Sequence, residues 1–200
     1  MCEVKYLYFP INKCGNTSFK KIFEKYNHIV IPNLNLDNDE NKNLHLLKKN
    51  FDKFFKFTLI KHPLNRLISA INMFITNKLI TMDNWKKVFD IMKNHESYNL
   101  TNKNMNDYIK RHTLPLTSPL YCLLNDKNEI IVDLVIKLEN INYKQFFNKI
   151  KINENEIIPF ENKSEKYLTI NNFSEDDLNF VYEYYKKDLI IFNYDKILNY

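Results

Sequence analysis

A short segment near the start of the 200-residue chain, PINKCGNTS over residues 10–18, has the composition of an anion-binding loop. It holds Gly15, which is the only glycine in the chain, and Lys13. A glycine lets the backbone approach an anion closely, a lysine supplies a mobile cation, and the hydroxyls of Thr17 and Ser18 donate hydrogen bonds. The segment suits a phosphate or sulfate group, but taken alone it also fits an ordinary turn before a helix. It does not match GxxxxGK[ST], so an ATP or GTP hydrolase is not indicated.

A second segment, KFTLIKHPLNRLISAINMF over residues 56–74, also combines cations with a hydroxyl. Lys61 lies at the end of an apolar run, and Arg66 and Ser69 are three residues apart, so they share a face in the first turns of a following helix. Two cations and a hydroxyl at such a junction suit a second phosphate group. The alternative is a solvated basic turn with Ser69 as a small packing residue.

The pattern of apolar residues predicts the elements that must position both segments. We expect strands over residues 4–9, 56–61 and 130–136. We expect helices from Thr17 or Ser18, over 64–75, in pieces over 82–112, over 138–150 and over 174–189, with a long loop over 29–50 that includes a short helix near 44–49. Strands that alternate with helices predict a parallel α/β sheet. Ligands of such sheets bind beyond the carboxyl ends of the strands, where both segments fall.

Composition restricts the class of protein. The length suits a single domain over residues 1–200. The net charge of +5 includes no concentrated block of cations, so we expect no nucleic-acid partner. Three widely spaced cysteines do not suggest a disulfide framework or a zinc site. No apolar stretch reaches about 18 residues and no signal peptide is recognisable, so we expect no membrane span and a cytoplasmic location.

Taken together, the two segments resemble a known family, the PAPS-dependent sulfotransferases, and especially their carbohydrate branch (Golgi-type, sulfotransferase family 2-like). PAPS is 3′-phosphoadenosine 5′-phosphosulfate. The first segment is similar to the family's PKxGxTS loop, and the second to its F-x-F-x-x-V-R-x-P-x-x-R-L-x-S-A-Y segment. The matching residues are Lys13, Gly15, Thr17, Ser18, Phe57, Pro63, Arg66, Leu67, Ser69 and Ala70. Weaker similarity continues through Asp133, Glu139, Asp188, Phe192 and Tyr194.

The resemblance implies a fold, a reaction and a set of site residues. The fold would be a P-loop-containing nucleotide-hydrolase-like three-layer sandwich with a central parallel sheet. The reaction would move the sulfuryl group of PAPS to a hydroxyl acceptor, with a glycan favoured by the branch and no metal required. Lys13 would be catalytic, and the donor would be bound by Lys13, Cys14, Gly15, Asn16, Thr17, Ser18, Lys61, Arg66 and Ser69.

Several questions stay open at this point. His45 lies about where the family places its general base, with Glu40 and His28 as other candidates; His95 and His112 fall in the presumed acceptor region, and His62 looks structural. The family usually has Arg at the position of Lys61, and Lys lacks the planar fork that grips a phosphate. A P-loop-like nucleotide kinase and a non-catalytic nucleotide-binding protein are the competing functions. The sequence does not indicate an oligomeric state.

Overall fold

The computed structural model describes residues 5–30, 51–94, 104–121, 123–158 and 165–197. Contacts within the chain divide it into two units. The first unit comprises residues 1–60 and 119–161, and the second comprises residues 61–118 and 162–200. Each unit therefore collects two separate stretches of the chain, and each is described below by itself.

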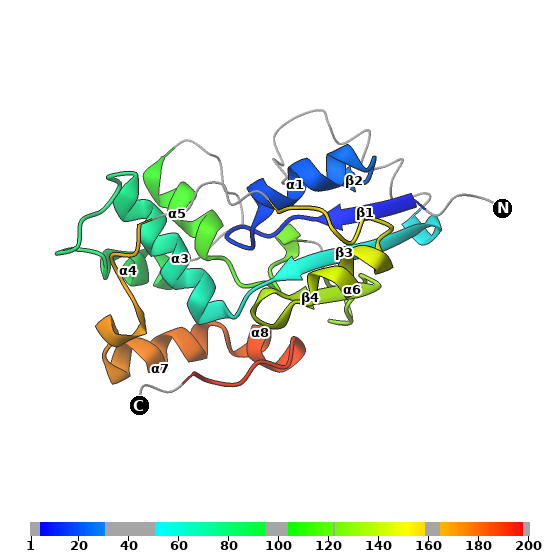
Figure 1. Ribbon diagram of the computed structural model, residues 1–200. Helices are drawn as coiled ribbons and strands as arrows, with labels where there is room; N and C mark the ends of the chain where they lie inside the picture. The colour runs from blue at the N-terminus through cyan, green and yellow to red at the C-terminus, as the bar shows by residue number, and fades with distance from the viewer. Residues whose placement is uncertain (1–4, 31–50, 95–103, 122, 159–164, 198–200) are drawn as a thin grey trace. The chain divides into compact units, whose positions relative to one another are not determined.

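The first unit contains a four-stranded sheet in the order β2-β1-β3-β4 (Figure 1). Its strands are β1 (Lys5–Phe9), β2 (Ile29–Val30), β3 (Phe54–Ile60) and β4 (Leu134–Lys137). All pairs are parallel, with Phe9 opposite Thr58 and Ile60 opposite Lys137. The carboxyl ends of β1, β3 and β4 therefore lie at one edge of the sheet. This arrangement confirms the predicted parallel α/β class.

Aromatic side chains form the core of the first unit. Tyr8 lies in β1 and Phe57 in β3, and both are fully buried. They pack against helix α1 (Asn16–Lys25), whose Phe23 ring lies 4.6 Å from the Tyr8 ring and 5.1 Å from the Phe57 ring. Helix α6 (Tyr143–Lys149) adds Phe146, whose ring lies 6.0 Å from that of Phe57. Burial of these rings holds both helices against the sheet.

The second unit is helical. Its helices are α3 (Pro63–Thr76), α4 (Lys87–Lys93), α5 (Met105–Thr113), α7 (Glu175–Tyr184) and α8 (Lys186–Ile191). Helix α3 begins sharply because Pro63 occupies its first turn and His62 caps it, the Nδ1 atom accepting from the Leu64 N–H at 3.2 Å. Nε2 of His62 donates to the carbonyl oxygen of Asp195 at 2.8 Å. The ring therefore joins the start of α3 to the backbone near the C-terminus, which is the structural role that the sequence suggested. Leu67, Ile71 and other apolar residues of α3 contribute to one core of this unit.

Two predicted starts of elements were wrong. Helix α1 begins at Asn16, with Gly15 at its N-cap, instead of at Thr17 or Ser18. The third strand begins at Leu134 instead of residue 130, because the preceding residues turn back and Ile130 forms an isolated antiparallel bridge with Leu124. Apolar composition alone could not separate the turn from the strand.

Other boundaries differ less. Strand β2 lies where the sequence predicted only loop, since two residues are too short for a recognisable period. The predicted helix over 138–150 is interrupted, and Asn142 caps α6 by accepting from the Gln145 N–H at 3.0 Å. The predicted helix over 174–189 is divided at Tyr185 into α7 and α8, and Ser174 is the N-cap of α7. The short helix near 44–49 lies outside the described residues.

Within the described ranges, no helix combines the length and apolarity that crossing a bilayer would demand.

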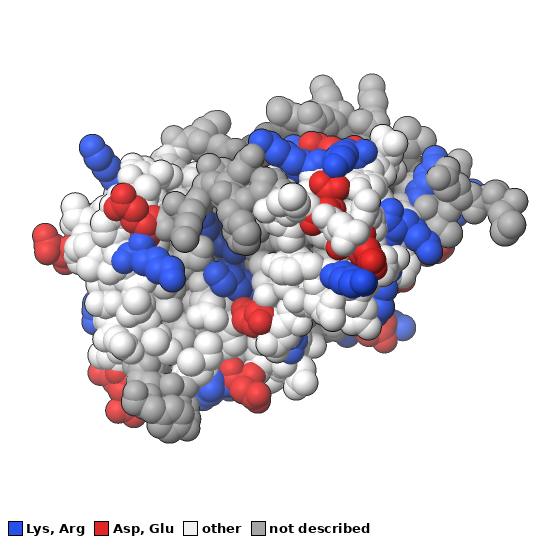
Figure 2. Space-filling model, viewed as in Figure 1, with Lys and Arg blue, Asp and Glu red and all other residues white. Residues whose placement is uncertain are grey.

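On the face drawn in Figure 2, basic and acidic side chains of the described residues are interspersed. Short turns of 3-10 helix complete both units: Phe51–Lys53, Pro119–Tyr121, Leu138–Asn140 and Ile170–Asn172.

His28 is buried in the first unit, where it joins the end of α1 to α6. Its ring stacks on Tyr6 with centroids 4.8 Å apart, and Nε2 donates to the carbonyl oxygen of Ile150 at 2.8 Å. Burial lowers the pKa of His28 below its usual value, so the neutral ring is favoured in the folded state.

The free energy of unfolding should therefore fall as the pH drops below about 6.5, because the unfolded chain then takes up a proton at residue 28 that the folded chain does not. The variant His28→Gln keeps a donor for the Ile150 carbonyl but does not titrate. Urea denaturation at pH 7.5 and pH 5.5 should show a smaller loss of stability for this variant than for the wild type. Equal losses would contradict this role of His28.

Candidate active site

The loop between β1 and α1 reverses the hand of its backbone twice. Lys13 has φ +66° and Gly15 has φ +76°, while Cys14 between them is not in the positive-φ region. Alternation of this kind turns successive N–H groups toward one concave side, which is the usual basis of an anion-binding nest. The loop is closed by the N–H of Cys14, which donates to the Ile11 carbonyl at 3.1 Å.

Gly15 is required by the conformation and by the space. Its left-handed backbone is rarely adopted by other residues. A Cβ atom at this position would also lie 3.1 Å from Cδ2 of Phe19. Since Gly15 is directly followed by Asn16, the first residue of α1, the loop leads straight into the unpaired N–H groups of a ten-residue helix.

The residues of the loop differ in how far their side chains are exposed to solvent. Gly15 and Thr17 are exposed, and Lys13, Asn16 and Ser18 are partly exposed. The structure therefore brings these five predicted residues together at one loop–helix junction. Cys14 is fully buried, so only its backbone faces the loop and its thiol packs inside the unit.

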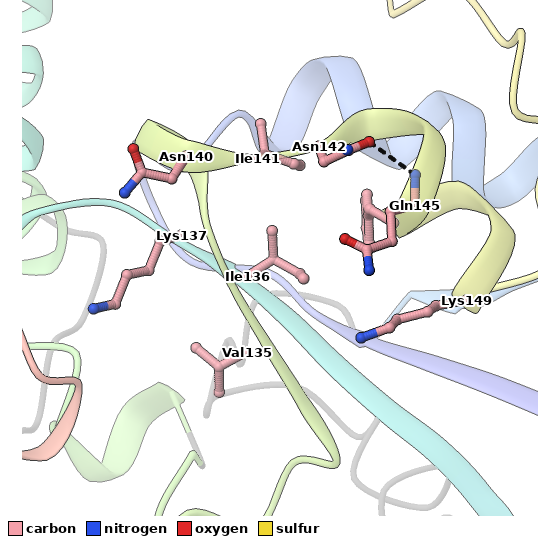
Figure 3. Close-up of a pocket in the computed structure, with 9 residues that line it drawn as sticks. Val135, Ile136, Lys137, Asn140, Ile141, Asn142, Gln145 and Lys149 are labelled. Carbon is pink, nitrogen blue, oxygen red and sulfur yellow. Dashed lines mark hydrogen bonds between the residues drawn. The ribbon is translucent and has the colours of Figure 1, made fainter.

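A hollow of about 170 Å³ lies between β4 and α6 in the same unit (Figure 3). Its lining combines apolar side chains with the amines of Lys137 and Lys149 and with carboxamides: Val135, Ile136, Lys137, Asn140, Ile141, Asn142, Gln145, Phe146 and Lys149. Leu138, next to Lys137, reaches within 4.0 Å of a Cβ built on Gly15, so the carboxyl end of β4 adjoins the loop. The sequence did not indicate this hollow, although residues 135–137, 140 and 141 of its lining belong to the segment around Asp133 and Glu139 that resembles the family.

The second predicted segment begins in β3, which belongs to the first unit, and its residues from Lys61 onward belong to the second unit. Strand β3 ends at Ile60, one residue before the predicted end, and Lys61 and His62 lead into α3. Lys61 is partly exposed, and Ser69, in the second turn of α3, is also partly exposed. Both side chains are accessible to a ligand.

Arg66 differs from them, because it is fully buried within the second unit. Its guanidinium donates to the carbonyl oxygen of Leu114 and lies 5.6 Å from the centre of the Tyr185 ring. The carboxylate of Asp188 accepts from the N–H groups of Leu116 at 2.6 Å and Thr117 at 2.9 Å. A buried cation and a buried carboxylate thus bind neighbouring backbone groups of one loop.

The Asp188 carboxyl is subject to opposing electrostatic influences. Burial raises the pKa of the Asp188 carboxyl. The Arg66 guanidinium and the hydrogen bonds from the N–H groups of Leu116 and Thr117 oppose this rise. The Tyr185 hydroxyl adds a bond to the Thr113 carbonyl at 2.6 Å. These contacts give Arg66 partners inside the fold, and its direct contact with the donor stays a prediction.

The remaining candidate residues divide into two groups. His28 and His62 are held in the structural contacts described above, and Nδ1 of the partly exposed His112 donates to the Tyr108 carbonyl at 2.9 Å. His45, Glu40 and His95 lie outside the described residues. Within the part of the chain that the structure describes, no three His, Cys, Asp or Glu side chains gather as a metal-binding group.

The variant Gly15→Ala should lower the free energy of unfolding by about 1–2 kcal/mol, because alanine disfavours the left-handed backbone and its methyl group meets Phe19. Lys13→Gly is a matched control at the neighbouring positive-φ position and should not destabilise the protein. Urea denaturation of both variants checks this. A Gly15→Ala variant as stable as the wild type would show that the loop is not constrained in this way.

The variant Arg66→Ala should lower the free energy of unfolding by about 3–5 kcal/mol, because it leaves the buried Asp188 carboxylate without its cation. Lys86→Ala is the control in the same unit: its amine lies 2.6 Å from Asp177, but the Lys86 side chain is 56% exposed, so the expected cost is at most about 1 kcal/mol. Thermal or urea denaturation measures both. Similar small losses would refute a supporting role for Arg66.

Comparison with known proteins agrees with this geometry. A model of the sulfotransferase family matches residues 3–195, which is nearly the whole chain and includes both loop segments. No curated protein and no solved structure gives a significant match. Members of the family are PAPS-dependent enzymes with a P-loop-like α/β fold, in agreement with the parallel sheet and the loop after β1. The chain belongs to the sulfotransferase family and is an enzyme of sulfuryl transfer.

Proposed function

We propose that this sulfotransferase uses PAPS as its donor and transfers the sulfuryl group to a hydroxyl of a carbohydrate. The observation that carries the proposal is the loop from Lys13 to Ser18, in which a double reversal of the backbone leads directly into α1. Such a loop offers several N–H donors, a partial positive charge and a lysine to one small anion. The 5′-phosphosulfate of PAPS is an anion of that kind.

In the proposed reaction, the acceptor oxygen attacks the sulfur atom in line with the oxygen that leaves. A new S–O bond forms to the acceptor, the S–O bond to the 5′-phosphate breaks, and the products are a sulfate ester and 3′,5′-ADP. Lys13 neutralises the charge that develops on the leaving phosphate oxygen. Thr17 and Ser18 donate hydrogen bonds that keep the phosphosulfate aligned.

We assign the 3′-phosphate of the donor to Lys61 and Ser69, which are both partly exposed. The amine of Lys61 supplies charge and the hydroxyl of Ser69 supplies a directional hydrogen bond. Arg66 supports this end of α3 from inside the unit through its bond to the Leu114 carbonyl. A lysine at position 61 offers a point charge without the bidentate geometry of arginine, so donor affinity depends more on Ser69.

The acceptor proton needs a base, and His45 remains our proposal for it. This assignment depends on its position between the two loop segments in the sequence. An imidazole with an ordinary pKa can accept a proton near neutral pH. We also propose that residues 1–200 act as one sulfotransferase domain, because the family match spans both units. A carbohydrate acceptor is favoured by the branch of the family that the motifs resemble.

The two alternative functions that the sequence left open predict different results in binding and transfer experiments. A nucleotide kinase would bind ATP in preference to 3′,5′-ADP. A non-catalytic member would bind 3′,5′-ADP without transferring sulfate. Incubation with radiolabelled PAPS and a panel of polysaccharides separates the enzyme from the non-catalytic alternative, and incorporation of label into one polysaccharide would name the acceptor class.

Isothermal calorimetry should show that the wild type binds 3′,5′-ADP more tightly than ATP. Lys13→Ala should reduce the rate of sulfate transfer by about 100- to 1,000-fold, because the leaving oxygen loses its cation. Lys20→Ala is the matched control: Lys20 is an exposed lysine of α1, 3.6 Å from Glu24, and its removal should leave both binding and transfer unchanged. Preference for ATP, or full activity of Lys13→Ala, would refute the proposed function.

A further inference from the structure

A single hydroxyl connects the buried core of the first unit to the loop that leads into α1. Tyr8 lies in β1 and is fully buried, with its ring 4.6 Å from that of Phe23 and 5.3 Å from that of Phe57. Its hydroxyl donates to Oδ1 of Asn16 at 2.8 Å. A phenylalanine would fill the same apolar space, so the hydroxyl is the feature that the packing does not explain.

The bond orients the Asn16 side chain. A carboxamide is planar and has an acceptor oxygen on one side and an NH₂ group with two donors on the other. Because the oxygen accepts from the Tyr8 hydroxyl, the NH₂ group points to the opposite side of the amide. Asn16 is also partly exposed and is the first residue of α1, next to Gly15. The junction therefore presents a fixed pair of side-chain donors beside its N–H groups.

We propose that Tyr8 is a positioning residue that fixes the Asn16 carboxamide as a hydrogen-bond donor to the anion bound at this junction. The inference rests on the proposed function, since the anion is the 5′-phosphosulfate of the donor or the 5′-phosphate of the product. Burial also raises the pKa of the Tyr8 phenol well above its usual value, so the hydroxyl stays a donor at physiological pH.

The binding of 3′,5′-ADP, measured by calorimetry, tests the proposal through a double-mutant cycle. Tyr8→Phe and Asn16→Ala should each weaken the affinity about five- to tenfold, which is the usual effect of one lost hydrogen bond. Because Tyr8 acts through Asn16, the double variant should bind no more weakly than Asn16→Ala alone. A purely structural effect of Tyr8 would instead add to that of Asn16.

Tyr26→Phe is the matched control, since it removes a hydroxyl from the other end of α1. The Tyr26 hydroxyl bonds Glu156 at 2.7 Å, away from the loop, so its loss should leave the affinity for 3′,5′-ADP unchanged. A wild type that does not bind 3′,5′-ADP would refute the proposed function. A wild type that binds, together with a Tyr8→Phe variant of equal affinity or with additive losses in the cycle, would refute the role of Tyr8 alone.

A second variant keeps the test informative if Tyr8→Phe does not fold. Asn16→Asp places a negative charge in the first turn of α1, where it favours the helix, so the stability of the protein should not fall. The same charge replaces two donors that face the anion, so the affinity for 3′,5′-ADP should drop at least tenfold below that of Asn16→Ala. Equal affinities of Asn16→Asp and Asn16→Ala would show that the amide does not face the anion.

Discussion

The left-handed backbone at Gly15 is the constraint on which the candidate site of the first unit depends. It allows the chain to leave β1, turn within a few residues and enter α1 at Asn16 without an intervening linker. The short connection keeps the first N–H groups of α1 beside the carboxyl end of the strand, where a bound anion gains from both the loop and the helix. Phe19 packs against the space where a side chain at position 15 would be, so the core of the unit and the loop require the same glycine.

The two units use positive charge in contrasting ways. In the first unit, Lys13 is partly exposed and stands on a turn, where its charge is available to a ligand. In the second unit, Arg66 is enclosed, and its charge is used to hold the Leu114 carbonyl and to accompany the Asp188 carboxylate. An arginine suits the enclosed position because its guanidinium is more weakly hydrated than an ammonium group and packs on aromatic faces, here that of Tyr185. The accessible groups of that segment are then Lys61 and Ser69.

Hydrogen bonds to buried side chains make both regions rigid. The Tyr8 hydroxyl reaches Asn16 from the aromatic core of the first unit, and Asp188 holds the N–H groups of Leu116 and Thr117 in the second. Buried polar groups of this kind are costly unless they are satisfied, so each one specifies a single arrangement of the loop that it holds. Rigid loops suit a transfer reaction, because alignment of the reacting atoms is a large part of what an enzyme without covalent chemistry contributes.

The sequence by itself determined the parallel α/β class, the loop with Lys13 and Gly15, and the family, because these depend on local composition and on the order of elements. It could not determine that Gly15 caps α1, since a hydroxyl side chain and a left-handed glycine are both good helix starts, nor that the third strand begins only at Leu134. Only the tertiary structure separated Arg66 from Ser69: the two share a helix and a motif, and burial depends on which distant residues pack around them. The bond from Tyr8 to Asn16 is equally invisible in the sequence, because a tyrosine in a buried strand looks like any other aromatic core residue until its hydroxyl is seen to have a partner.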